Sequence, residues 1–159
     1  MSARLSMALL GLWLGLAGQA QAGCAVGEGR FVMDGPDRFI DSQSLLMWQH
    51  CPQGRVGARC GDGPLDGFHW RGAVSRQGAV NAAAVDGVQD WQIPSVAQLQ
   101  GLFATACGLP AQIPSGLYWS RDPSPKAGYL RQAVAAGTAE AMTVNAGTFG
   151  LHLWLVRPL

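Results

Sequence analysis

The residues of this sequence with the clearest chemical potential are its four cysteines, Cys24, Cys51, Cys60 and Cys107. An even number of cysteines in an exported chain usually oxidises in pairs, and four cysteines allow three pairings. Cys51 and Cys60 enclose a short segment that contains glycine and proline, which favours a local disulfide. Cys24 would then join the N-terminal segment to Cys107.

Four further side chains are candidates for ligand contact: Tyr129, Trp154, Arg55 and Arg59. An exposed aromatic ring could stack on a sugar, and two arginines in one loop could bind a sulfated group. A net charge close to zero argues against strong binding of polyanions. The other tryptophans of the mature chain are expected in the core, whereas Trp154 is less clearly assigned; they are Trp48, Trp70, Trp91 and Trp119.

Other chemistries find little support in the pattern. A glycosidase needs two placed carboxylates, yet Glu28 and Glu140 are the only glutamates. The Gly-x-Ser-x-Gly elbow of serine hydrolases is absent, as is the Cys–His spacing of zinc sites. Asp34, Asp37 and Asp41 fit a turn better than a calcium cage. We therefore predict a non-enzymatic protein with no catalytic residue, no cofactor and no metal.

The N-terminal segment predicts export. Arg4 precedes an apolar run over residues 5–17, which is too short to span a bilayer, and Ala20-Gln21-Ala22 resembles a cleavage signal. We predict a signal peptide over residues 1–22 and one domain over residues 23–159, periplasmic, secreted or at the cell surface. An uncleaved anchor and lipidation at Cys24 are the alternatives. Loss of Arg4 takes the net charge from +1 to about zero, which favours neither nucleic acid nor an anionic membrane as partner.

The periodicity of the remaining chain predicts an α+β fold. Apolar residues at three- and four-residue steps indicate helices over 68–85 and 96–106, the second capped by Ser95 with Gln98. Both faces of the last strand are apolar, so we expect it to be central in its sheet. The candidate strands cover residues 38–41, 45–50, 91–93, 118–123, 129–135, 140–144 and 150–157.

The chain carries a series of ordered motifs: Arg38-Phe39, Met47-Trp48, Cys51, Trp70 with Ala73, Asp90-Trp91-Gln92-Ile93-Pro94-Ser95, Gln98-Leu99, Tyr118-Trp119-Ser120 and Val156-Arg157. In this order they resemble the C-terminal domain family of the Legionella collagen-like adhesin. The resemblance extends over about residues 30 to 159, and Cys60 and Cys107 match cysteines that members often carry. The chain departs from the family pattern at Gln92, Ile93 and Gln98, and the loss of arginine at position 92 should weaken a structural ion pair.

The resemblance implies a fold and a role. The family is similar to C-type lectin-like and formylglycine-generating-enzyme-like folds, in which two helices pack on a twisted antiparallel sheet. It implies an exported, non-catalytic module that binds a glycan or a protein at the cell surface, as an adhesin or appendage component. The alternatives are a structural accessory of an envelope or pilus assembly and, third, a secreted hydrolase. We expect no integral membrane span and leave oligomer formation open.

Overall fold

The computed structural model describes residues 29–105 and 108–159, so the predicted signal peptide and both Cys24 and Cys107 lie outside the described residues. Two antiparallel sheets and two α-helices make up the described chain, which confirms the α+β class. In chain order the elements are β1 Phe31–Met33, β2 Arg38–Asp41, β3 Leu46–Gln49, α1 Trp70–Ala83, the short 3-10 helix η1 Val85–Gly87, α2 Val96–Phe103, β4 Leu117–Pro123, β5 Leu130–Ala135, β6 Ala141–Asn145 and β7 Val156–Pro158.

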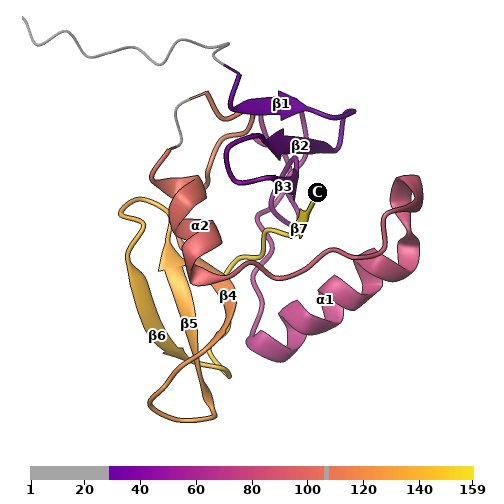
Figure 1. Cartoon of the computed structure of the whole chain (residues 1–159). Helices are drawn as coiled ribbons and strands as arrows, with labels where there is room; N and C mark the ends of the chain where they lie inside the picture. The colour runs from indigo at the N-terminus through magenta and orange to yellow at the C-terminus, as the bar shows by residue number, and fades with distance from the viewer. Residues whose placement is uncertain (1–28, 106–107) are drawn as a thin grey trace, which may run out of the picture.

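The sheets differ from the single sheet that the sequence led us to expect. One has the strand order β1-β2-β3-β7 and the other the order β4-β5-β6, and every strand pair is antiparallel. Figure 1 shows the two sheets in different parts of the molecule, with α2 beside the three-stranded sheet and α1 on the far side of β4. Two sheets therefore replace one continuous sheet, and β1 is a strand that the sequence analysis missed.

The predicted strand over residues 150–157 is wrong over most of its length, because only β7 forms a ladder. Residues 151–155 bond to several segments in turn: Leu151 to Phe68, Leu153 to Gln53 and Leu155 to Gln49. A segment that serves several partners cannot form a regular ladder with one of them. It is nevertheless buried on both faces, as its apolar pattern indicated. Similarly, the predicted strand over 91–93 is reduced to one bridge, between Gln92 and Val156.

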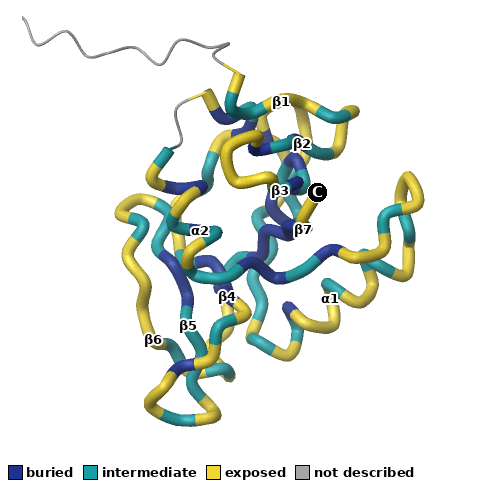
Figure 2. Tube along the Cα trace, viewed as in Figure 1, coloured by how far each residue is buried: buried dark blue, intermediate teal, exposed yellow. Residues whose placement is uncertain are grey.

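Two apolar clusters lie on opposite faces of the three-stranded sheet. Tyr118 and Val134 pack with the buried residues of α2 on one face, while their chain neighbours Trp119 and Ala133 face Ala73 of α1 on the other. This alternation is the two-residue period of a strand. Figure 2 shows buried residues along β4 and β5, whereas β6 and most of α1 are exposed. Helix α2 therefore covers one face of the sheet, and the start of α1 contacts the other face, where Trp70 packs against Trp119.

Side-chain caps define where both helices begin. Ser95 Oγ accepts a hydrogen bond from Gln98 N at 3.2 Å, and Gln98 Oε1 accepts one from Ser95 N at 2.8 Å, so the predicted capping box is confirmed. His69 Nδ1 accepts from Gly72 N at 2.8 Å and caps α1. Because His69 is the cap, α1 begins at Trp70 rather than at the predicted residue 68. Among the described residues, no helix has the length and apolar character that a membrane crossing requires.

Candidate functional site

A disulfide between Cys51 and Cys60 closes a loop beside β3, which confirms the local pairing. Arg55 Nη1 donates hydrogen bonds across the loop to the carbonyl oxygens of Gly61 at 3.1 Å and Gly63 at 2.8 Å. Gly54 has a φ of +86°, and a Cβ there would lie 2.5 Å from the carbonyl oxygen of Pro64. The loop is thus fixed by a covalent bond, by Arg55 and by a position that only glycine fits.

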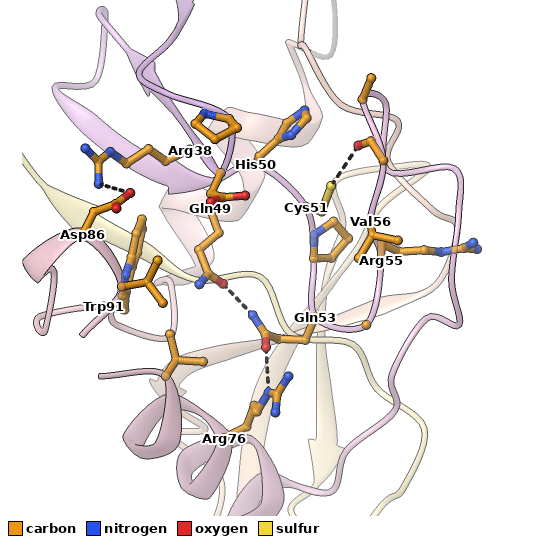
Figure 3. A pocket seen from close by; sticks show the side chains of 18 residues that line it. Arg38, Gln49, His50, Cys51, Gln53, Arg55, Val56, Arg76, Asp86 and Trp91 are labelled. Atoms are coloured by element: carbon orange, nitrogen blue, oxygen red, sulfur yellow. Dashed lines mark hydrogen bonds and ion pairs between the residues drawn. The ribbon is translucent and has the colours of Figure 1, made fainter. Parts of the chain in front are cut away.

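A groove of about 650 Å³ lies between this loop, the ends of β2 and β3, helix α1 and η1. We call it the groove throughout. Figure 3 shows Trp91 and Asp86 on one side and Cys51 and Val56 on the other, with a row of polar side chains between them. Its volume falls within the range of small-molecule and cofactor sites, roughly 300–1,000 Å³. The polar residues that line it include Arg38, Gln49, Gln53, Arg76 and Asp86.

The polar row runs from α1 to β3. Arg76 Nε donates to Gln53 Oε1 at 2.7 Å, and Gln53 Nε2 donates to Gln49 Oε1 at 2.5 Å. An arginine has donors only, so the Gln53 oxygen must face Arg76, and the amide group of Gln53 must then donate to Gln49. The chemistry of arginine therefore determines the orientation of both glutamine amides.

Backbone contacts hold the two glutamines in place. Gln49 N donates to the carbonyl oxygen of Leu155 at 3.0 Å, and Gln53 N to that of Leu153 at 2.9 Å. The segment that fails to form a regular strand thus anchors the floor of the groove. Arg76 reaches the groove because it follows Ala73, the buried residue of α1, by three positions, which puts both on one helix face.

The charges around the groove differ in how far they are neutralised. Arg38 Nε pairs with Asp34 at 2.7 Å, and Arg38 Nη1 lies 3.7 Å from Asp86. Within the described part of the chain, Arg76 has no carboxylate partner within 4.0 Å. Asp37 is exposed at the rim. Two arginines that line the groove, Arg76 and Arg55, therefore have no carboxylate partner among the described residues, and Arg55 directs its Nη1 to carbonyl oxygens of the loop.

The four predicted ligand-contact residues do not come together in one site. Trp154 is 0% exposed, and its Nε1 donates to the carbonyl oxygen of Gln49 at 2.7 Å, so its ring belongs to the core and cannot stack on a ligand. Tyr129 is 65% exposed but does not line the groove. Arg59 is exposed outside the groove, whereas Arg55 lines it but is engaged in the loop.

Gln49, Gln53 and Arg76 were missed as site residues by the sequence analysis. Gln49 adjoins the Met47-Trp48 motif and Gln53 follows Cys51, but nothing local connects either residue with Arg76. Arg76 falls within the helix predicted over residues 68–85, and an arginine on a helix usually faces solvent. A contact between side chains 23 positions apart leaves no local sequence signal.

Two groups of potential metal ligands are already occupied, one by the disulfide and the other by ion pairs. His50, Cys51 and Cys60 bring ligand atoms within 4.8 Å of one another, but the disulfide occupies both sulfurs. Asp34 pairs with Arg38, and Asp41 forms a two-point ion pair with Arg30. These sulfurs and carboxylates are therefore committed to holding the fold.

The ion pair of Asp41 has a consequence for its protonation. Burial alone would raise the pKa of Asp41, but hydrogen bonds from Arg30, Ser44 and Gln43 outweigh it and hold the pKa below its ordinary value. On the other side of the core, burial raises the pKa of Tyr118, whose hydroxyl donates to the carbonyl oxygen of Pro114.

At Gln92, where the family resemblance expects arginine, Oε1 accepts a hydrogen bond from Arg121 Nη1 at 2.5 Å. A glutamine thus pairs here with an arginine, while the neighbouring Asp90 forms an ion pair with Arg157 at 2.7 Å.

Comparison with protein-family models matches residues 38–157 to the Lcl C-terminal domain. The matched span runs from β2 into β7 and includes the residues that line the groove except Pro36 and Asp37. No curated protein matches the chain.

Proposed function

Because the chain belongs to the Lcl C-terminal domain family, we propose that it is an exported, non-catalytic module that binds a surface ligand in the groove. The family indicates an Lcl-type surface or adhesin-related domain. The disulfide between Cys51 and Cys60 supports an oxidising compartment outside the cytoplasm. The groove itself is the single observation that carries the proposal, because it combines ligand-site volume, rigid walls and unneutralised polar groups.

The composition of the groove favours binding over hydrolysis. Among the described residues that line it there is no serine, threonine, lysine or free thiol. Hydroxyls, thiols and amines are frequent nucleophiles of covalent catalysis, and carboxylates can also serve. The carboxylates that line the groove are Asp37, which is exposed at the rim, and Asp86, which lies 3.7 Å from Arg38. His50 lines the groove but is buried, and its Nε2 lies 3.5 Å from the carbonyl oxygen of Pro110. These residues support a site that holds a ligand unchanged.

Filling the groove tests this function. In Ala58→Trp, a large ring replaces an exposed methyl group at the groove lining, whereas Arg59→Trp places the same ring one residue away, outside it. The oxidised wild-type domain and both variants would be applied to glycan and peptide arrays. We expect Ala58→Trp to lose the wild-type signals and Arg59→Trp to keep them. Equal signals from all three proteins would exclude the groove, and turnover of a glycoside, ester or peptide would favour a hydrolase.

One observation favours the structural-accessory alternative. Among the strands of the described chain, β6 pairs only with β5. It carries no charged residue and is mostly exposed along its length, with Met142 43% exposed. An uncharged edge strand offers free backbone groups for pairing with another chain. Replacing Thr143 on β6 by proline would block such pairing. If that variant folds but no longer co-purifies with an envelope partner that the wild type retains, the accessory role is the better description.

A further inference from the structure

We propose that the groove binds the C-terminal carboxylate of a peptide that ends in an aliphatic residue, with Arg76 as its anchor. This inference rests on the proposed function, because it names the ligand class of the same groove. It follows from three features of the groove: the direction of its hydrogen bonds, its charge balance and the apolar residues on its two sides.

Along the row of Arg76, Gln53 and Gln49, the hydrogen bonds leave mainly N–H donors without a partner. Arg76 Nε donates to Gln53, and the side-chain oxygens of Gln53 and Gln49 each accept one hydrogen bond along the row. In the described structure, neither Nη of Arg76 nor Nε2 of Gln49 donates to another protein atom. A group that accepts several hydrogen bonds and carries negative charge complements these donors. The end of a guanidinium, with its two parallel N–H groups, matches a carboxylate.

The charge balance limits how much negative charge the groove accepts. Arg38 is paired with Asp34 and Asp86, and Asp37 adds a carboxylate at the rim. Arg55 also lines the groove, but its Nη1 is engaged by the carbonyl oxygens of Gly61 and Gly63. One carboxylate can therefore pair with Arg76, but a row of sulfates or phosphates would meet Asp37 and Asp86 as like charges. The groove thus favours a ligand with a single anionic group over a polyanion.

The side walls favour an aliphatic chain beside that carboxylate. Val80, Val85 and Trp91 lie on the α1 side, and Pro52 and Val56 on the loop side. Val85 and Val56 are 57% and 58% exposed, so both have apolar surface left to bury. Trp91 is only 5% exposed and offers no open ring face for stacking on a sugar. A peptide terminus with an aliphatic last residue fits these walls better than a uronic acid does.

The test compares carboxylate and amide forms of the same peptides. Fluorescein-labelled hexapeptides ending in Leu, Ile or Val, each as free acid and as carboxamide, would be titrated with the oxidised domain and followed by anisotropy. We expect the acids to bind at least tenfold more tightly, since a hydrogen-bonded ion pair is lost in the amide. A glucuronate-terminated disaccharide added as competitor should displace them poorly.

Two arginines of the same helix provide the matched variants. Arg76→Gln removes the proposed anchor, whereas Arg71→Gln changes an exposed arginine that does not line the groove. Arg76→Gln should abolish the difference between acid and amide, and Arg71→Gln should preserve it. Arg76→Lys keeps the charge without the planar fork, so it should recover only part of the difference. Circular dichroism of each variant checks that the fold is intact.

The outcomes separate this inference from the proposed function. If acids and amides bind alike, or Arg76→Gln changes nothing while Ala58→Trp abolishes binding, the groove is a ligand site but the carboxylate assignment is wrong. If the glucuronate disaccharide binds through Arg76 and the peptides do not, the peptide assignment is wrong. If no peptide binds at all, the inference is overturned, and array signals lost in Ala58→Trp would still support the groove.

Discussion

Removing the disulfide by replacing both Cys51 and Cys60 with alanine should lower the free energy of unfolding by about 3.4 kcal/mol. The bridge joins residues at a sequence separation of 9. Closing a loop of that length restricts the unfolded chain by about 2.6 kcal/mol at room temperature in the chain-entropy model. Cys60 is 1% exposed, so its sulfur adds a burial contribution similar to one methylene, about 0.8 kcal/mol.

Several contacts keep the folded loop in place without the bridge. Arg55 still donates to Gly61 and Gly63, and Val56 still pairs with Asp62. The variant should therefore fold, and the loss should come mainly from the gain in freedom of the unfolded chain. At roughly 4 °C per kcal/mol for a domain of this size, Tm should fall by roughly 14 °C.

Urea unfolding followed by tryptophan fluorescence measures this loss, because Trp48, Trp119 and Trp154 are buried. Arg59→Ala is the control, since Arg59 is an exposed residue of the same loop and its replacement should stay within about 0.5 kcal/mol of wild type. A loss below about 1 kcal/mol in the double alanine variant, with the m value unchanged, would refute the reasoning. It would mean that the bridge barely restricts the unfolded chain.

Three further substitutions probe the scaffold. Asp41→Asn should cost about 3 kcal/mol, because it leaves the guanidinium of Arg30 without its two-point partner. The pKa of Asp41 is lower in the folded state than in the unfolded state. The stability that its charge contributes is therefore complete above the unfolded pKa of about 4 and is lost as pH falls through the folded pKa. Urea titrations from pH 7 to pH 2 should accordingly show a smaller decrease in the free energy of unfolding at acid pH for this variant than for wild type. Asn81→Ala should lower the free energy of unfolding in urea by about 2 kcal/mol, because the Asn81 side chain forms hydrogen bonds with both the N–H and the carbonyl of Trp91. A loss below about 0.5 kcal/mol would contradict a stabilising role for these two hydrogen bonds. Ser95→Ala should cost about 1 kcal/mol through loss of the helix cap, and an unchanged Tm would count against the capping box.

The parts of the fold that the sequence predicted well are those encoded by local signals. The helix cap at Ser95 depends on residues three positions apart, and the hairpin of β2 and β3 depends on two short apolar runs joined by a polar turn. The disulfide of Cys51 and Cys60 also joins near neighbours. Each of these features is complete within a dozen residues, so a single sequence contains enough information to predict it.

The last strand shows why the remainder could not be predicted. Its alternating apolar residues correctly indicated burial on both faces, but burial does not specify a hydrogen-bond partner. Leu151 bonds to the segment before α1, and Leu155 to β3. Trp154 was misjudged for a related reason: a tryptophan can serve in a core or on a binding surface, and only its neighbours decide.

The residues of the family motifs and the polar residues of the groove carry different information about function. The motifs that place it in its family supply the buried core through Phe39, Trp48, Trp91, Tyr118 and Trp119. They position the groove without providing the free hydrogen-bond donors of its polar row. Arg38, the motif residue among the polar lining, is paired with Asp34 and Asp86.

Those donors come from Gln49 and Arg76, which lie beside or outside the motifs and are not buried. A chain with the same core and another residue in place of Arg76 would keep the scaffold but lose the cation of the polar row. Family membership is therefore evidence for the fold and for a surface role, whereas the ligand depends on the few side chains that line the groove.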